Sequence, residues 1–347
     1  MIRPSRGYSI VEILVVLFLM SIVSLIFYQL LDGTIESSMF LESHNDLSTF
    51  GQQAVNTIQT EVHQAKMLFE DDPLGNDFRN ALEIPAAHPV WGGSDTSKMP
   101  VFDEATQQLK PDNGAGTDRR VGNCLLIARQ LAPLTVEVDT DGDSHNDSQI
   151  LADRYRFQFY YVSPNTNRSF KGSGFYLDLI ESRSVVHADY FQLSNMGDQP
   201  ASDPVRQQVG KALYLQGITH AWDPGQPIDA AFYTIDETGN PSTDPTEEPV
   251  IDLASAKSLL PQFAGGRISG KIDYSVGFLP ASGPAFPVRT AMPVYAVQDR
   301  SFPGGLEFLV VVPSGSRKVL TRLVLLSAYK ASKMDSHESF VVTSARS

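Results

Sequence analysis

The sequence predicts an α+β protein, in which one long N-terminal helix packs on antiparallel β-sheet and precedes an enlarged, mostly β C-terminal region. Two observations predict this fold. An apolar run near the N-terminus continues into a stripe with helical spacing, and runs of β-forming residues dominate from Val121 onward. With 347 residues, 42% of them hydrophobic, the chain can bury a sizeable core, and 22 Pro with 25 Gly favour many loops.

The first 31 residues have the pattern of a membrane anchor. Residues 1–7 form a polar leader with Arg3 and Arg6, and residues 8–31 contain a nearly unbroken apolar run from Ile13 to Leu31. About 20 apolar residues cross the hydrocarbon core of a bilayer, so this run is long enough to span it as a helix. Because arginines stay on the cytoplasmic side, we expect the N-terminus inside and the rest of the chain outside.

Glu12 stands at the head of this apolar run, where an ionised carboxylate costs several kcal/mol unless it is paired. A cut between Gly7 and Tyr8 would create an α-amino group one helical turn before Glu12, and the amine and the carboxylate would then pair. The same pairing can form between neighbouring copies of the chain.

The run Arg6, Gly7, Tyr8, Ser9, Ile10, Val11, Glu12, Ile13, Leu14 resembles the class III signal peptide of type IV prepilins and type II secretion pseudopilins. The shared features are a basic leader that ends in Gly, an aromatic residue after it, and Glu as fifth residue of the mature chain. The resemblance implies that prepilin peptidase cuts after Gly7, that Tyr8 is N-methylated, and that Glu12 neutralises the N-terminal amine of an adjacent subunit. It also implies a pilin-like fold.

Two departures from major pilins favour a minor subunit: the membrane segment contains no proline, and the chain is long. In these respects the sequence resembles the large W-type minor pilins and the J-type minor pseudopilins, which begin assembly at the filament tip. We therefore expect a non-catalytic subunit whose partners are the prepilin peptidase, the bacterial inner membrane and other pilins or pseudopilins, in the periplasm or at the cell surface. The sequence does not distinguish among a pilus, a competence apparatus and a type II secretion system as the assembly that contains this subunit.

A different class of protein fits the same anchor. A signal-anchored extracytoplasmic domain that binds a ligand or hydrolyses a substrate would also begin with a basic leader and an apolar helix. An uncleaved N-terminus would favour this alternative.

Beyond the membrane, residues 32–71 are predicted to continue the helix outward. Apolar residues recur there at steps of three or four, as on a helix that packs one face on a sheet: Leu47, Phe50, Ala54, Ile58, Val62, Ala65 and Phe69. Pro73 and Gly75 predict that the helix ends near residue 71. Residues 72–120, rich in Asp, Asn, Pro and Gly, are predicted to form an irregular connection that can include one short helix.

Residues 121–347 are predicted to form a β-rich globular domain. Its strand-like runs are Cys124–Ala128, Leu134–Val138, Tyr155–Val162, Gly174–Ile180, Ala212–Ile218, Ile268–Phe278, Leu306–Val312 and Val319–Leu326. The last two flank a Pro-Ser-Gly-Ser sequence, which predicts an antiparallel hairpin. Residues 240–248 are predicted to be a mobile loop, and residues 332–347 are predicted to be a polar tail that frays at its end.

An Asp-rich segment within this domain is a candidate calcium loop. Asp139, Asp141, Asp143 and Asp147 occupy positions 1, 3, 5 and 9, and the carbonyl of His145 could supply position 7. The spacing resembles EF-hand-like and thrombospondin type 3 loops, but Ser144 replaces their glycine and Ile150 their final acid. If calcium binds, we expect a structural ion that offsets the like charges. The alternative is a solvated acidic turn without metal.

Charge and motifs exclude several other classes of function. A net charge of -13 without any run of basic residues argues against a nucleic-acid partner. Cys124 is the sole cysteine, so no intramolecular disulfide or CxxC site can form. The seven histidines show no zinc-hydrolase spacing, and no GxSxG elbow or P-loop is present. A catalytic triad whose members meet only in the folded protein stays open as an alternative, but the sequence does not predict an enzyme.

Overall fold

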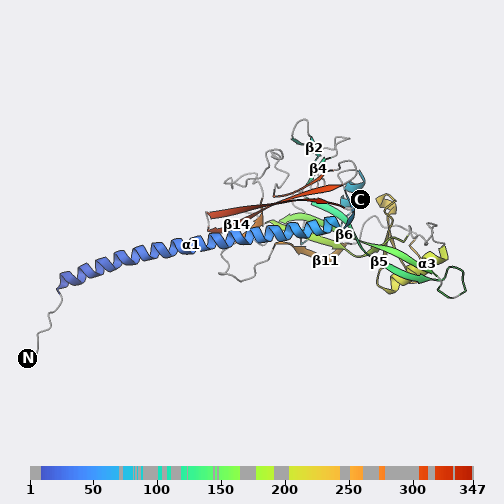
Figure 1. The fold of residues 1–347 in the computed structure, drawn as a ribbon, viewed down its shortest axis with the longest axis horizontal. Coiled ribbons are helices and arrows are strands. Elements are labelled where there is room, and N and C mark those ends of the chain that lie inside the picture. Colours follow the sequence, from blue (N-terminus) through green and yellow to red (C-terminus); the bar gives the residue numbers. More distant parts are fainter. Residues whose placement is uncertain are drawn as a thin grey trace, which may run out of the picture.

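The structure is a computed structural model that describes residues 9–69, 73–80, 82, 84, 87–88, 101–103, 108–110, 119–122, 124–143, 145–146, 148–164, 177–190, 203–242, 251–260, 273–277, 305–311, 317–330 and 333–345. One long helix, α1 (Ile10–His63), projects as a rod from a β-rich head, which we define as residues 65–345. Figure 1 shows the N-terminus at one end of the molecule and α3 (Asp203–Leu215) at the other.

Helix α1 changes its environment along its length. Its outer half is exposed, whereas its inner half buries a stripe with helical spacing against the head: Met39, Ser43, Leu47, Gly51, Ala54, Val55, Ile58, Glu61 and Val62. This stripe contains most of the apolar positions expected from the sequence. The helix ends at His63, not near residue 71, because Ala65 and Met67 pair with Arg129 and Ala128 as strand β1 (Ala65–Leu68).

The first sheet has eight strands among the described residues and is antiparallel except where β8 meets β9. Its strands are β1, β5 (Cys124–Val138), β6 (Ser148–Pro164), β7 (Leu177–Ser184), β8 (His187–Ala188), β9 (His220–Trp222), β10 (Phe232–Thr234) and β11 (Ile251–Ser258). We call it sheet A. The start of β5 is buried on both faces, which explains its continuous apolar run.

The second sheet, sheet B, has seven strands in the described part of the chain and is antiparallel. Its strands are β2 (Val101–Asp103), β3 (Gln108–Lys110), β4 (Arg119–Gly122), β12 (Asp273–Val276), β13 (Leu306–Val311), β14 (Lys318–Lys330) and β15 (Lys333–Ser344). Strands β13 and β14 form the hairpin expected from the sequence, although residues 312–316 between them lie outside the described residues.

The main core lies where α1 meets both sheets. Leu47 and Ile58 of α1 belong to one buried cluster with Leu125 of β5, Phe308 of β13 and Leu323 of β14. A second, aromatic cluster lies beside α2 (Pro73–Asn80), and a third packs α3 on the outer ends of β5 and β6. The pilin-like α+β architecture expected from the sequence is confirmed.

The structure differs locally from the sequence predictions. The polar tail from residue 332 contains a strand that was not predicted, because β15 pairs with β14 along nearly its whole length, whereas residues 346–347 at its end lie outside the described residues. Residues 212–215 belong to helix α3, whose Val205, Val209 and Leu213 recur every four residues and bury one face. The connection over residues 72–120 contains α2, the one short helix that the prediction allowed, and also the short strands β2 and β3. Residues 174–176, 243–248 and 268–272 lie outside the described residues.

Candidate functional site

The first turn of α1 holds Glu12 in a defined position. The Ser9 backbone N–H donates to Glu12 Oε2 at 3.0 Å, and the Val11 N–H donates to Ser9 Oγ at 3.3 Å, so that Ser9 and Glu12 form a capping box. The carboxylate therefore lies beside the residue that follows Tyr8 and stabilises the positive end of the helix dipole. Gly7 and Tyr8 themselves lie outside the described residues.

The outer half of α1 presents an apolar surface that no other described element covers. Every residue from Ile10 to Leu31 is exposed, including Phe18 at 66% and Tyr28 at 71%. Among the described helices, α1 is the one that is long and apolar enough to cross a membrane. An exposed apolar surface of this length is stable in lipid or against other helices, and not in water.

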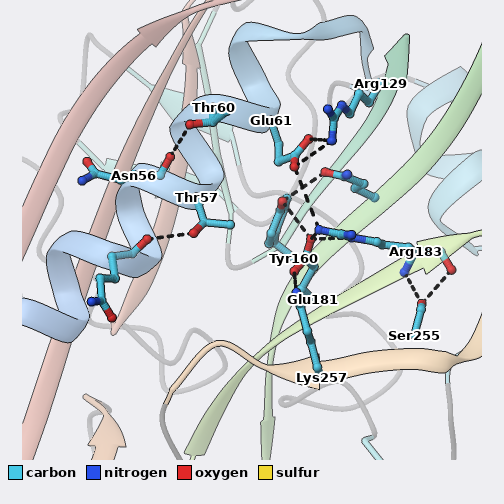
Figure 2. Close-up of polar contacts among 12 residues, drawn as sticks. Asn56, Thr57, Thr60, Glu61, Arg129, Tyr160, Glu181, Arg183, Ser255 and Lys257 are labelled. Atoms are coloured by element: carbon cyan, nitrogen blue, oxygen red, sulfur yellow. Dashed lines mark hydrogen bonds and ion pairs between the residues drawn. The ribbon is translucent and has the colours of Figure 1, made fainter. Parts of the chain in front are cut away.

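The inner end of α1 is held on sheet A by a buried carboxylate (Figure 2). Glu61 lies in the last turn, where the helix dipole disfavours negative charge, and α1 supplies no Lys or Arg to offset it. Arg129 of β5 does so, because its Nη1 lies 2.9 Å from Glu61 Oε1 and 2.7 Å from Oε2. Arg183 of β7 lies 4.0 Å from Oε1. The helix end is therefore fixed by charge as well as by packing.

Glu181 extends this cluster to β11. Arg183 donates to Glu181 Oε1 from Nε at 2.8 Å and from Nη2 at 2.7 Å, and Lys257 Nζ lies 3.1 Å from Oε2. The Tyr160 hydroxyl points at the same carboxylate. Burial, and then the charges of Glu181 and Glu61, raise the pKa of Tyr160 well above its usual value, so the hydroxyl keeps its proton and can donate. The cluster joins α1 to four strands of sheet A.

Comparison with models of protein families finds a match for the N-terminal segment, which includes most of the outer half of α1. Residues 2–28 match a family described as the prokaryotic N-terminal methylation motif, which is typical of type IV pilins and pseudopilins. The N-terminal segment is therefore that of a type IV pilin-like protein. No curated protein and no solved structure matches it in the same comparisons.

The motif has direct consequences for this pilin-like protein. It implies processing by prepilin peptidase, N-terminal methylation and pilus-type assembly. The exposed apolar helix, together with this motif, indicates that the protein is anchored in the inner membrane before assembly. Pilin-like proteins are generally not catalytic. The class III signal peptide read from the sequence is confirmed by the family match.

The pilin-like helix also makes polar contacts where it enters the head. His44 Nδ1 lies 2.9 Å from Asp335 Oδ2 of β15, and the Tyr274 hydroxyl of β12 donates to Asp46 Oδ2 at 2.8 Å. Burial, and then the bond to Asp46, raise the pKa of Tyr274. Together with Glu61 these contacts hold the inner half of α1 at both of its ends.

The Asp-rich loop lies at the tip of the β5–β6 hairpin, at the end of the head opposite the N-terminus (Figure 1). Carboxylate oxygens of Asp139, Asp141 and Asp143 lie within 4.8 Å of one another, and this partly exposed triad could hold a metal ion. The loop is tied to α3, because the Asp139 N–H donates to Gln208 Oε1 at 2.9 Å and Gln208 Nε2 donates to the Asp139 carbonyl at 2.8 Å. His145 follows the triad with an exposed side chain, and Asp147 lies outside the described residues.

Sequence reasoning missed the attachment of the helix. An acid in the last turn of a helix without cations is a readable signal that another element must supply a partner, but the sequence does not say that Arg129 is that partner. It also missed the capping box, whose Ser-x-x-Glu spacing was present at Ser9. The sequence contains no run of basic residues, so it did not predict that two arginines would lie together. The pairing of β5 with β6 places Arg129 directly opposite Arg156.

Proposed function

We propose that this protein is a structural, non-catalytic subunit of a type IV pilus-like filament or a type II secretion pseudopilus. The observation that carries the proposal is the division of α1 into an exposed apolar half headed by Glu12 and a buried half fixed in the head. Such a helix can sit in the inner membrane and then pack among other helices without any change in the head. The N-terminus faces the cytoplasm and the head faces outward.

The large head supports a minor subunit that acts in assembly initiation or at the tip. In this arrangement prepilin peptidase cuts after Gly7, Tyr8 becomes the methylated N-terminus, and Glu12 pairs with the amine of a neighbouring subunit. The capping box favours this pairing, because it already directs the carboxylate toward the start of the mature chain.

The experiment that tests the proposal is mass spectrometry of the intact protein, expressed with and without its native prepilin peptidase. The expected result is a chain that begins at a methylated Tyr8 when the peptidase is present and at Met1 when it is absent. A chain that begins at Met1 in both cases would support the signal-anchored binding or hydrolytic domain instead.

We further propose that the Asp-rich loop binds calcium as a structural ion. The carboxylates of Asp139, Asp141 and Asp143 converge, and in this proposal Asp147 and the His145 carbonyl would supply further oxygen ligands of the kind that calcium prefers. The bound ion would offset the repulsion among these acids and stabilise the loop on α3 through Gln208. Its place at the distal end of the head suits a contact region of a tip subunit.

A further inference from the structure

Two histidines lie side by side where the β9–β10 hairpin joins sheet A. His187 of β8 is paired with Tyr155 of β6 on one side and with His220 of β9 on the other. The two imidazole rings have centroids 5.6 Å apart. Among the described strands, β9 and β10 reach the rest of sheet A through β8, which is two residues long. The pair therefore occupies the ladder that joins residues 203–242 to the sheet.

The hydrogen bond of His187 fixes its tautomer. Nδ1 lies 3.0 Å from the Val185 carbonyl oxygen. A carbonyl only accepts, so Nδ1 carries the proton and Nε2 carries a lone pair. Nε2 is buried and has no hydrogen-bond partner in the described part of the chain. A second proton must therefore add at Nε2, where it would place a charge in apolar surroundings without an acceptor.

The surroundings of the pair are aromatic. Phe157 lies 5.2 Å and Phe232 5.4 Å from the His187 ring, both edge-on, and Trp222 packs on Phe157 at 4.9 Å. Trp222 Nε1 is also buried without a hydrogen-bond partner among the described residues. Imidazolium in this cluster would lose its hydration, and two imidazolium rings would repel each other at short range.

The charged and titratable groups nearby do not relieve this cost. Tyr155 stays neutral, because burial and then the charges of Asp153 and Asp189 raise its pKa. Arg79 of α2, beside the same cluster, donates to the Phe69 carbonyl at 2.8 Å. Burial, and then His220, lower the pKa of His187 to about 3 against a weaker opposing effect of the Val185 carbonyl. Partial burial lowers the pKa of His220.

We propose that His187 and His220 form an acid-sensitive latch, which releases the α3–β9–β10 unit (residues 203–242) from sheet A when both imidazoles are protonated. The packed state binds these protons weakly and the open state binds them at the ordinary affinity of histidine. The open state is therefore favoured as the pH falls below the usual histidine pKa. The latch does not depend on the proposed filament function.

Opening of the latch has a structural consequence at the distal end of the head. Helix α3 belongs to the released unit, and its Gln208 holds Asp139 by two hydrogen bonds. The Asp-rich loop would lose this support when α3 moves. Acid would thus loosen the tip region while the α1 attachment at Glu61 stays in place, because that cluster lies on other strands.

Hydrogen exchange of the full-length protein in detergent tests the latch. The quantity to compare, after correction for intrinsic exchange rates, is the protection of β9 and β10 amides relative to those of β5 residues 124–131. Between about pH 6.5 and pH 5 this ratio is expected to fall by roughly 15-fold for each histidine that titrates only in the open state with a pKa of about 6.5. The His187→Gln/His220→Gln variant is expected to lose this fall.

Matched variants keep the test decisive. The His220 side chain is partly exposed, so His220→Gln alone should fold, and it should reduce the fall because one of the two imidazoles is removed. His145→Gln changes an exposed histidine outside the latch and should leave it intact. An unchanged ratio in the wild-type protein, an undiminished fall in the double or the His220→Gln variant, or a parallel loss of protection in β5 would overturn the proposal.

Discussion

At the scale of single residues, the buried carboxylate of Glu61 is expected to contribute most to holding α1. Glu61→Ala leaves Arg129 without its close partner, and removal of one member of a buried pair costs about 3 kcal/mol. Urea unfolding of the full chain in detergent measures this cost. Thr60→Ala, on the exposed side of the same helix turn, is the control and should change stability by less than about 0.5 kcal/mol. Equal effects of the two changes would contradict the role of Glu61.

The burial of His187 is expected to make the free energy of unfolding fall as the pH falls. Its pKa in the folded protein is lowered to about 3, so the unfolded chain binds a proton that the folded chain does not. The stabilisation is complete above the unfolded pKa of about 6.5 and is lost as the pH falls, by up to about 1.4 kcal/mol per pH unit. His187→Gln should flatten the slope of unfolding free energy between pH 6.5 and 4, whatever its effect at pH 7. A slope equal to that of wild type would refute the assignment.

The Asp-rich loop is expected to respond to calcium through its central acids. Asp141→Asn and Asp143→Asn together remove two charges from the triad, and calcium affinity should fall by at least about tenfold because ligand charge sets affinity in such loops. Calorimetric titration of the full-length protein with calcium gives the affinity. Asp229→Asn, an exposed acid outside the loop, is the control. No heat from the wild-type protein would leave the loop as a solvated acidic turn.

At the scale of secondary-structure elements, the contact between α1 and β15 depends on one glycine. A Cβ atom at Gly51 would overlap Ser339 Oγ and lie 3.3 Å from His337 Cδ2. We expect Gly51→Ala to destabilise the head by about 1–3 kcal/mol, despite the higher helix propensity of alanine. Thermal unfolding in detergent measures the effect.

A second change separates overlap from helix propensity. Ser339→Ala removes the overlapping oxygen and leaves the Ser339 Cβ at an ordinary 3.5 Å from the new methyl group, so it should restore most of the stability lost in Gly51→Ala. Gly33→Ala, where nothing lies within 4 Å, should not destabilise the protein. A Gly51→Ala protein as stable as wild type would show that α1 and β15 are not packed this closely.

The residues of this contact explain why strand β15 was not predicted from the sequence. Residues 335, 337, 339, 341 and 343 of β15 face α1, but three of them are Asp, His and Ser, so the strand lacks the apolar alternation that identifies a half-buried strand. One of these polar residues pairs across the interface, because Asp335 Oδ2 lies 2.9 Å from His44 Nδ1. Alternation alone cannot reveal a strand whose buried face carries polar residues and packs on a distant helix.

At the scale of the whole molecule, Glu12 is expected to decide whether the protein enters a filament. Glu12→Ala should leave membrane insertion unchanged but lower incorporation by about tenfold or more, because an unpaired N-terminal amine in an apolar helix bundle costs more than 1.4 kcal/mol. Immunoblots of sheared filaments and of membranes measure the two quantities. Ser9→Ala weakens the helix cap without removing the carboxylate and is the control. Unchanged incorporation of Glu12→Ala would exclude the pairing.

The sequence by itself determined the membrane anchor, the continuation of its helix into an apolar stripe, the candidate processing residues and the strands with apolar runs. These features depend on neighbours in the chain: an apolar run long enough for a bilayer, a helical repeat, or a turn between two strands. The β13–β14 hairpin and the central part of β6 belong to this group, because their partners or their periodicity lie within short segments.

Only the tertiary structure decided how the helix is attached and what the isolated polar residues do. Glu61 pairs with Arg129, which is 68 positions away in the sequence. His187 lies beside His220 of the neighbouring strand, and residues near the end of the chain form β15, which packs on α1. Each of these pairings joins segments that are far apart in the chain, and its stability depends on burial that no local pattern encodes. Local periodicity fixes which face of an element is apolar, but the fold determines which charges that face must satisfy.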